Sequence, residues 1–185
     1  MNTNILIVVC TNRGVQPQTM QCLMDLEGDF DVLVCEEGYT IAENRNYASV
    51  QAINGKYSWM LFVDDDMTFE PGLIEELIIN DKDICGVTYR PRCDDSNKKT
   101  YHETHRDNLK SDKLFETDGV GTGIMLIKTK ILLNIPRPWF DFEWFENGCC
   151  KMGEDWMFCK KAKASGFKVW CNPTISVGHL GEKIV

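Results

Sequence analysis

The segment Trp59-Met60-Leu61-Phe62-Val63-Asp64-Asp65-Asp66 decides the fold of this chain. Its apolar run, rich in aromatic and β-branched residues, is typical of a strand buried on both faces. Such a strand belongs in the middle of a largely parallel sheet, and ligands bind just beyond the carboxyl ends of those strands. Three adjacent carboxylates repel one another, and a divalent cation would relieve that repulsion. The alternative is a solvated acidic turn with no role in binding.

The composition predicts one soluble domain. The chain has 185 residues, 43% hydrophobic and 26% charged, so we expect a single domain over residues 1–185 with a substantial core. The net charge of -8 argues against a broad nucleic-acid surface but allows one small anionic ligand held by a metal and a few arginines. No apolar run reaches the roughly 18 residues of a transmembrane helix. The first residues lack the basic region of a signal peptide.

The cysteines predict a reducing environment. Their number is nine, which is odd, and no C-x-x-C pair or zinc-finger spacing occurs. Cys10, Cys35 and Cys85 lie in apolar segments, where cysteine behaves as a small hydrophobic residue. We therefore expect reduced thiols and a cytoplasmic protein. The adjacent pair Cys149-Cys150 could be reactive or metal-binding, but a buried or idle pair is the favoured interpretation.

Predicted strands alternate with predicted helices. The strands are expected at about 4–10, 31–35, 57–63, 83–89, 124–128 and 167–171, and the helices at about 17–27, 40–53, 71–80 and 153–165. Thr40 and Glu43 fit a capping box at the start of the second helix. This alternation indicates βαβ units and a parallel sheet in an α/β protein.

One long polar segment interrupts the alternation. Residues 90–118 have almost no apolar periodicity, so we expect a functional or disordered loop, and one interpretation is a lid that closes over a ligand. His102 and His105 lie in it at an H-x-x-H spacing, but no cysteine pair completes a zinc site, so solvated histidines are favoured. The glycine-rich run 119–123 follows, and its glycines suggest a backbone that a ligand approaches closely.

Five features occur in order along essentially the whole chain. They are NILIVVCTNRG at 4–14, IAENRNYA at 41–48, the acidic triplet 64–66, GVGTGIMLIK at 119–128, and Gly153-Glu154-Asp155 with a later His179. Together they resemble the GT-A family of nucleotide-sugar glycosyltransferases, particularly its small family-2-like members, with the triplet as the DxD motif. The resemblance implies a mostly parallel, Rossmann-like GT-A sheet flanked by helices. It also implies metal-dependent transfer of a sugar from a nucleoside diphosphate to an acceptor hydroxyl.

The resemblance also implies roles for single residues. Those expected to contact the nucleotide sugar are Thr11, Arg13, Glu36, Arg45, Asp64, Asp65, Gly121 and Gly123. Arg45 would add positive charge near the phosphates, although a solvated helix cation is the alternative. Many relatives have Asp where Glu36 or Glu37 stands here.

The metal would be held by Asp66, with Asp64 nearby and His179 as a second ligand. An imidazole beside a carboxylate favours Mn²⁺ over Mg²⁺. The metal would stabilise the diphosphate leaving group as a Lewis acid. Seen alone, a single late histidine is more often structural or solvated.

The acceptor hydroxyl needs a base, and Asp155 with Glu154 beside it is the candidate. The alternative is that both acids only stabilise the first turn of a helix through its dipole. Trp139 and Trp144 belong to an aromatic cluster and could line the acceptor side, although core packing also explains such residues.

Two other functions remain open. A sugar nucleotidyltransferase would carry a glycine-rich loop with Arg and Lys after the first strand, and CTNRGVQPQ has one Gly and one Arg. The second is a non-catalytic sugar-nucleotide or carbohydrate-binding module. For the enzyme, the expected partners are a nucleoside-diphosphate sugar and a carbohydrate, lipid-linked or protein acceptor, with no nucleic acid and no transmembrane segment.

Overall fold

The predicted central strand is β3 (Trp59–Asp64), which lies between β1 (Ile5–Cys10) and β7 (Ile124–Lys128) in a seven-stranded sheet. The computed structural model describes residues 4–36, 38–89 and 112–180. The strand order is β2-β1-β3-β7-β5-β10-β6. Strands β2 (Phe30–Cys35), β1, β3, β5 (Ile84–Val87) and β10 (Val169–Asn172) point the same way. The expected mostly parallel α/β sheet is confirmed.

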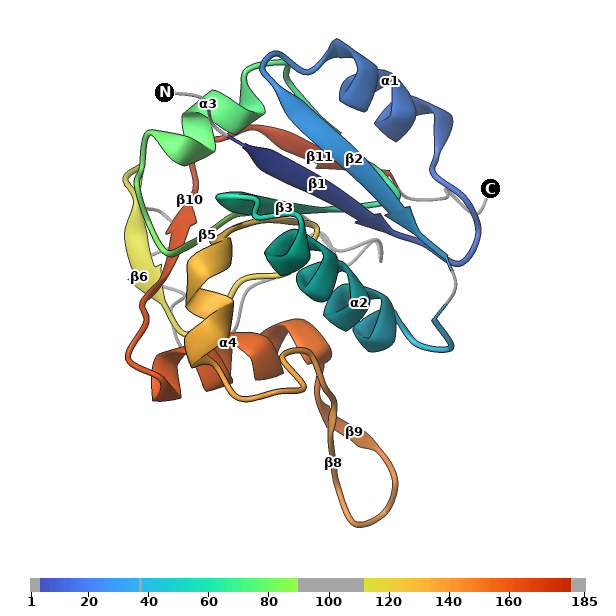
Figure 1. The fold of residues 1–185 in the computed structure, drawn as a ribbon, viewed down its shortest axis with the longest axis vertical. Coiled ribbons are helices and arrows are strands. Elements are labelled where there is room, and N and C mark those ends of the chain that lie inside the picture. The colour runs from blue at the N-terminus through green and yellow to red at the C-terminus, as the bar shows by residue number, and fades with distance from the viewer. Residues whose placement is uncertain (1–3, 37, 90–111, 181–185) are drawn as a thin grey trace.

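The other elements follow in chain order (Figure 1). They are α1 (Pro17–Asp25), α2 (Ile41–Asn54), β4 (Met67–Phe69), α3 (Leu73–Ile78), β6 (Phe115–Thr117), η2 (Thr129–Asn134), β8 (Glu143–Trp144), β9 (Cys150–Met152), α4 (Glu154–Ala164) and β11 (Val177–His179). Two small sheets pair β4 with β11 and β8 with β9.

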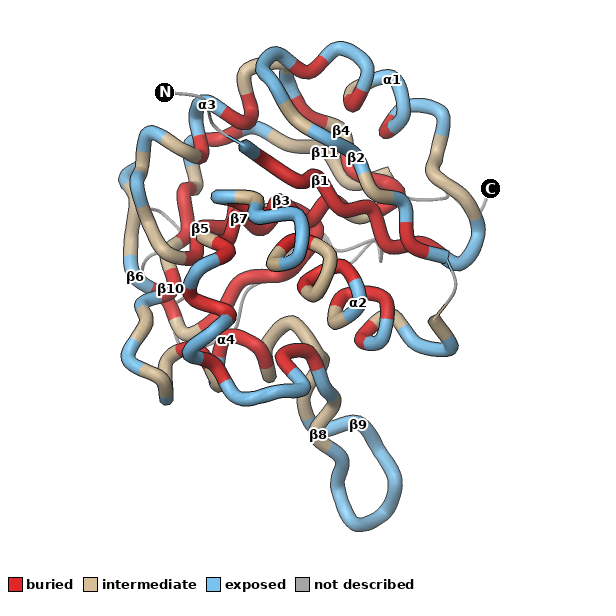
Figure 2. The backbone as a smooth tube through the Cα atoms, in the orientation of Figure 1, coloured by how far each residue is buried: buried red, intermediate tan, exposed pale blue. Residues whose placement is uncertain are grey.

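The sheet is the middle of three layers. Leu23 of α1 and Leu77 of α3 belong to the core on one face. Ala48 of α2, Ile131 of η2 and Phe158 of α4 belong to the core on the other face. Figure 2 shows buried backbone along the central strands. Fully burying a side chain such as Leu77 stabilises the fold by about 1.5–3 kcal/mol.

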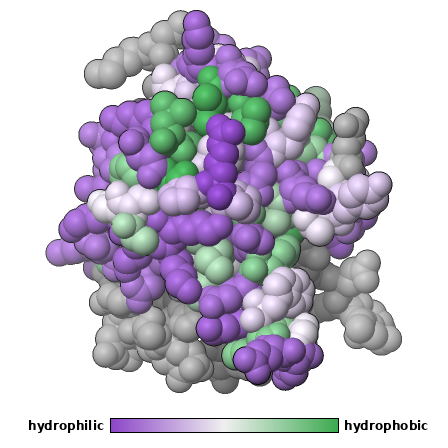
Figure 3. Space-filling model, turned by 60° about the horizontal axis from the view of Figure 1, so that its bottom comes forward, coloured by the Kyte–Doolittle hydropathy of each residue, from purple (hydrophilic) through white to green (hydrophobic). Residues whose placement is uncertain are grey.

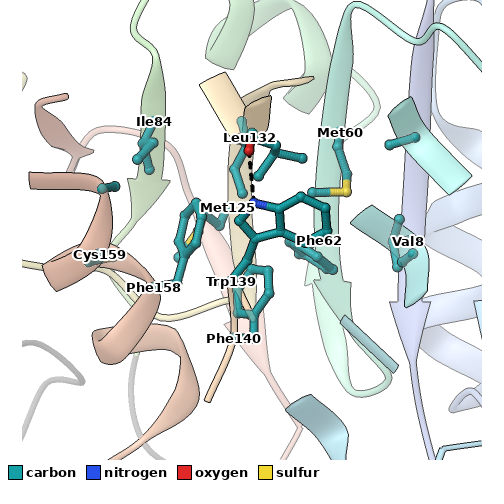
Figure 4. Close-up of a cluster of buried hydrophobic side chains, with 14 of the residues drawn as sticks. Val8, Met60, Phe62, Ile84, Met125, Leu132, Trp139, Phe140, Phe158 and Cys159 are labelled. Atoms are coloured by element: carbon teal, nitrogen blue, oxygen red, sulfur yellow. Dashed lines mark hydrogen bonds between the residues drawn. The ribbon is translucent and has the colours of Figure 1, made fainter. Parts of the chain in front are cut away.

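The largest buried side chain is Trp139, with 1% of its surface exposed. Its indole Nε1 donates a hydrogen bond of 2.9 Å to the carbonyl oxygen of Leu132 (Figure 4). Phe140 lies beside it in the same cluster, edge-on to Phe62 and stacked on Phe158. Of the two interpretations of Trp139, its burial favours core packing over a place on the acceptor side. Its surface is already covered by the core.

The capping box of α2 is confirmed. The Glu43 amide donates to Thr40 Oγ1 at 3.2 Å, and the Thr40 amide donates to Glu43 Oε2 at 2.9 Å. These two bonds satisfy backbone donors that the first turn of a helix otherwise leaves unpaired. The cap fixes where the helix starts, and Arg45 consequently falls in its second turn, near the carboxyl ends of β1 and β3.

The segment 90–118, expected to be a loop, contains strand β6. It pairs antiparallel with β10 and forms an edge of the sheet. Thr117 is buried and Phe115 packs against the core, while Glu116 between them is exposed. Three residues are too few for this alternation to be recognised in a polar sequence. The rest of the predicted lid, residues 90–111 with His102 and His105, lies outside the described residues.

The surface is largely polar on the face drawn in Figure 3, with smaller hydrophobic areas in its upper half. The β8–β9 hairpin projects from the body of the molecule just before α4 (Figure 1). Within the described ranges, none of the helices has the length and apolarity needed to cross a membrane. The eight cysteines in these ranges form no disulfide, and Cys149 and Cys150 are exposed rather than buried.

Candidate functional site

A cavity of about 270 Å³ opens at the carboxyl ends of β1 and β3 and the start of α2. It is lined by five of the residues that the sequence assigned to the nucleotide sugar, namely Thr11, Arg13, Arg45, Asp64 and Asp65. The strands β1 and β3 are parallel and in register from Ile5 with Trp59 to Cys10 with Asp64, so their ends meet. The expected position at the carboxyl edge of the sheet follows from that register.

Asp65 anchors the loop that follows β1. Its Oδ2 accepts a hydrogen bond of 2.6 Å from Thr11 Oγ1. Arg13 binds both carboxylate oxygens, from Nε to Oδ2 at 3.2 Å and from Nη2 to Oδ1 at 2.9 Å. The Gln16 amide donates to the carbonyl oxygen of Asp65 at 2.8 Å. The sequence predicts that Asp65 contacts the nucleotide sugar. In the structure its carboxylate is hydrogen-bonded to the loop after β1.

Asp66 is almost fully buried, with 2% of its side chain exposed. Its Oδ2 accepts a hydrogen bond of 3.1 Å from Arg13 Nη2, and its Oδ1 lies 3.2 Å from His179 Nε2. The pairing of β11 with β4 places His179 opposite Met67, and the Leu180 amide donates to the Asp66 carbonyl oxygen at 2.8 Å. The late histidine is therefore brought to the acidic triplet by a short strand pair that sequence reasoning did not predict.

The Asp66–His179 pair has a geometry that fits a divalent cation. Two ligands at 2.0–2.2 Å from one ion, at a right angle, lie about 3 Å apart, and the two atoms here are 3.2 Å apart. A carboxylate with an imidazole suits Mn²⁺. Among the described residues, no group of three or more His, Cys, Asp or Glu side chains could hold a metal. Within the described ranges, Asp66 and His179 are thus a pair of side chains that could contribute to a metal site.

Arg45 is a buried cation between two acids. Its side chain is 4% exposed, its Nη2 lies 3.0 Å from Asp64 Oδ1, and its Nη1 forms an ion pair with Glu154 Oε1. This ion pair joins α2 to the first residue of α4. The sequence considers Glu154 and Asp155 together as the base, but this ion pair gives the two residues different roles. Glu154 neutralises Arg45, whereas Asp155 remains the candidate for proton transfer.

Asp155 lies in crowded surroundings but keeps part of its surface accessible. Its Oδ1 accepts a hydrogen bond of 2.7 Å from the Trp156 amide. Burial raises the pKa of Asp155 above its ordinary value, although the charge of Arg45 favours the ionised form. A carboxylate with a raised pKa is a stronger proton acceptor near neutral pH.

Tyr89 is a residue of the site that sequence reasoning missed. A Cβ atom added to Gly121 would lie 2.1 Å from Tyr89 Oη, and one added to Gly123 would lie 2.6 Å from Tyr89 Cζ. The Gly123 amide donates to Tyr89 Oη at 3.0 Å, and the Tyr89 ring packs edge-on to His179 at 5.5 Å. The glycines thus make room for this ring. The position of Tyr89 at the end of a predicted strand, on the ligand side, was the available signal.

Two predicted residues lie apart from this centre. Glu36, at the end of β2, lines a neighbouring cavity of about 750 Å³, which shares Gly38, Tyr39 and Asn44 with the first cavity. Trp144 lies on the β8–β9 hairpin and is 59% exposed. Glu143 of the same hairpin forms salt bridges with Lys151 of β9 and Lys160 of α4. The bond to Lys160 attaches the hairpin to the helix that carries Asp155.

No family model matches the chain, and no curated protein matches it in sequence. Solved structures do resemble it. A197 from STIV has a TM-score of 0.72 at 18% identity, over 97% of this chain and 86% of that one. S. aureus TarS 1-349 in complex with UDP-GlcNAc has a TM-score of 0.60 at 13% identity, over 97% of this chain and 59% of that one. GalNAc-T7 with UDP, GalNAc and Mn²⁺ has 0.57 at 11%, over 96% and 43%.

The chain thus spans about half the length of the TarS and GalNAc-T7 chains. At such low identity these similarities establish the fold and not the activity. The sheet with its flanking helices matches the GT-A glycosyltransferase neighbours, as the five sequence features had indicated.

Proposed function

We propose that this protein is a metal-dependent glycosyltransferase that moves a sugar from a nucleoside-diphosphate sugar to an acceptor hydroxyl. The observation that carries the proposal is the meeting of the acidic triplet with His179, Arg45 and Asp155 at one edge of a GT-A sheet. The neighbours with bound UDP and Mn²⁺, or with UDP-GlcNAc, have the same kind of fold.

The charge of the site supports a role for a divalent cation. The described residues bring five carboxylates (Asp64, Asp65, Asp66, Glu154, Asp155) to only two guanidinium groups. His179 left aside, this is an excess of three negative charges. A diphosphate is itself an anion, and it would be repelled by this edge without an added cation. A requirement for metal is therefore expected from the charges of these described residues.

Asp66 and His179 would hold the metal, whose contribution when bound is to act as a Lewis acid on the diphosphate oxygens. Arg45 keeps Asp64 in place through the bond at 3.0 Å. Asp64 would then face the ribose, directly or through water. Asp155 would accept the proton of the acceptor hydroxyl while the hydroxyl oxygen forms a bond to the anomeric carbon. The bond from that carbon to the diphosphate breaks, and the electron pair leaves with the phosphate oxygen.

A thermal-shift screen of nucleoside diphosphates with and without Mn²⁺ tests the binding part. A ligand at about 100 times its Kd adds roughly 2.7 kcal/mol to the stability of the folded state. That corresponds to a shift of about 5–11 °C for a chain of this size. Stabilisation by UDP or GDP that requires Mn²⁺ is the expected result. Equal melting temperatures in all conditions would contradict the proposal.

Hydrolysis of the donor tests the catalytic part. A glycosyltransferase usually releases sugar slowly to water when no acceptor is present, so free nucleoside diphosphate should accumulate with Mn²⁺ and a matching sugar nucleotide. A binding module would give the thermal shift without this product. Asp155→Asn should retain the thermal shift and lose the hydrolysis, which separates a base from a residue that only supports binding.

A further inference from the structure

The guanidinium of Arg13 lies beside the carboxylates of Asp65 and Asp66, whose negative charges need a cation. Its guanidinium contacts Asp65 through two bonds and Asp66 through a third, at 3.2, 2.9 and 3.1 Å. Both of these carboxylates are buried, with 8% and 2% of their side chains exposed. Arg13 therefore neutralises part of the charge that a divalent ion would neutralise.

The contact with Asp66 competes with metal binding, whereas the contact with Asp65 does not. Asp66 Oδ1 faces His179 Nε2, and Asp66 Oδ2 accepts from Arg13 Nη2. A metal held by Asp66 withdraws electron density from the whole carboxylate and places a second positive charge beside the guanidinium. The two cations repel each other at that distance. Asp65, by contrast, is also fixed by Thr11 Oγ1 at 2.6 Å and stays where it is.

The side chain of Arg13 can move without its backbone. The Arg13 amide donates to Thr11 Oγ1 at 3.2 Å, and the Thr11 hydroxyl donates its hydrogen to Asp65 Oδ2 at 2.6 Å, so the turn is fixed to the end of β3. Gly14 has a φ of +86°, which a glycine adopts without strain. The Arg13 side chain is 42% exposed and lines the cavity of about 270 Å³. A rotation of the side chain alone would turn the guanidinium from the acids toward a ligand in that cavity.

We propose that Arg13 is an internal counter-ion that is exchanged on binding: it leaves Asp66 when the metal arrives and binds the diphosphate of the donor instead. This inference rests on the proposed function, because it assumes a metal on Asp66 and a diphosphate in the cavity. The exchange makes metal and donor binding cooperative. Metal alone must displace Arg13 from a good partner, whereas the donor offers Arg13 a new anionic partner at the same time.

The test measures Mn²⁺ and nucleotide affinity separately and then together. Mn²⁺ binding is followed by the loss of the free-ion signal in electron paramagnetic resonance. UDP and GDP are titrated by calorimetry, with their own affinity for Mn²⁺ subtracted. In the unchanged protein, saturating nucleotide should tighten Mn²⁺ binding at least about tenfold, and Mn²⁺ should tighten nucleotide binding by the same factor.

Arg13→Gln removes the charge but can still donate a hydrogen bond to Asp65. It should bind Mn²⁺ alone about tenfold more tightly than the unchanged protein, because the charge-assisted hydrogen bond from Arg13 to Asp66 no longer has to be broken. It should bind nucleotide more weakly in the presence of Mn²⁺. The factor by which each ligand tightens binding of the other should therefore fall toward one. Arg13→Lys keeps a cation without the planar fork and should lie between the two. The control Arg137→Gln removes an exposed guanidinium over the Trp139 ring and should change neither affinity.

Three outcomes would overturn the inference. Mn²⁺ binding by Arg13→Gln that is no tighter than in the unchanged protein shows that Arg13 does not compete with the metal. Tighter Mn²⁺ binding with unchanged nucleotide affinity shows that Arg13 never reaches the diphosphate. Failure of the unchanged protein to bind either Mn²⁺ or nucleotide removes the proposed function as well. In the first two cases the proposed function survives.

Discussion

Replacing Arg45 by Met tests the centre of the site most directly. The Arg45 side chain is 4% exposed and contacts Asp64 and Glu154, whose side chains are 28% and 13% exposed. Removing one partner of a buried ion pair costs about 3–5 kcal/mol, because the remaining charges are left without compensation. Water can reach Asp64 in part, so we expect a loss of about 2–4 kcal/mol in the free energy of unfolding. The melting temperature should fall by about 2–4 °C for each kcal/mol.

Urea unfolding of a double-mutant cycle measures how much of that loss belongs to the ion pair. The four proteins are the unchanged chain, Arg45→Met, Glu154→Gln and the double variant. Because Glu154→Gln removes one of the uncompensated charges, the double variant should lose about 1–3 kcal/mol less than the sum of the single variants. Arg137→Met, on the exposed surface, should lose less than about 1 kcal/mol.

A loss below about 0.5 kcal/mol for Arg45→Met would place it among ordinary surface substitutions. Strict additivity in the cycle would show that Arg45 and Glu154 do not interact in solution. Either result would refute the reasoning that α2 and α4 are joined by a buried charge pair. The assignment of Asp155, rather than Glu154, as the base would then lose its structural argument.

Four other substitutions have distinct expected results. Asp66→Ala should abolish Mn²⁺-dependent nucleotide binding in calorimetry and leave a cooperatively folded protein; full Mn²⁺ dependence would exclude Asp66 as a ligand. Asp155→Asn should lower transfer about 10²- to 10⁴-fold. Because burial raises the pKa of Asp155 in the folded protein, the unchanged chain should lose stability as the pH rises from the ordinary pKa through the raised one. Asp155→Asn should lack that loss in urea titrations at several pH values. Trp139→Ala should cost about 3–5 kcal/mol, whereas the exposed Trp144→Ala should cost almost nothing; equal losses would contradict the burial described for them.

The parts of the fold that were predictable have local causes. The buried strand β3 follows from a run of apolar residues, and the start of α2 follows from Thr40 and Glu43, three positions apart. Both signals depend on neighbours along the chain, and both are confirmed. The carboxyl edge of the sheet could then be located, because parallel strands end on the same side.

The parts that were missed depend on contacts between distant segments. Strands β4 and β11 have three residues each and exist through their pairing with one another. An isolated pair of that size has almost no stability of its own, so the sequence carries little trace of it. The place of Trp139 was also open, because an aromatic residue can pack in a core or stack on a sugar, although core packing is the more common role. Its hydrogen bond to Leu132 and the rings around it decide in favour of the core.

The functional roles of the site residues are predictions, and the structure shows which segment each of these residues contacts. The sequence could propose that Asp64, Asp65 and Asp66 act together, since they are adjacent. It could not show which segment each acid would contact. Nor could it separate Glu154 from Asp155, since the partner of Glu154 is Arg45, more than a hundred positions away. These distinctions come from the three-dimensional arrangement of side chains.

The acidic triplet also has a structural consequence that connects stability to binding. The chain turns directly after β3, and its three carboxylates have different sets of partners: Asp64 meets Arg45 of α2, Asp65 meets Thr11 and Arg13 after β1, and Asp66 meets His179 of β11 as well as Arg13. Each contact supplies a positive or hydrogen-bonding group that reduces repulsion within the triplet. The contacts of Asp64 and Asp65 involve residues that line the cavity at the end of the sheet, and the contact of Asp66 with His179 lies next to them. Replacement of each acid should therefore loosen a different set of contacts, and hydrogen exchange of the three segments can distinguish these effects from one general loss of stability.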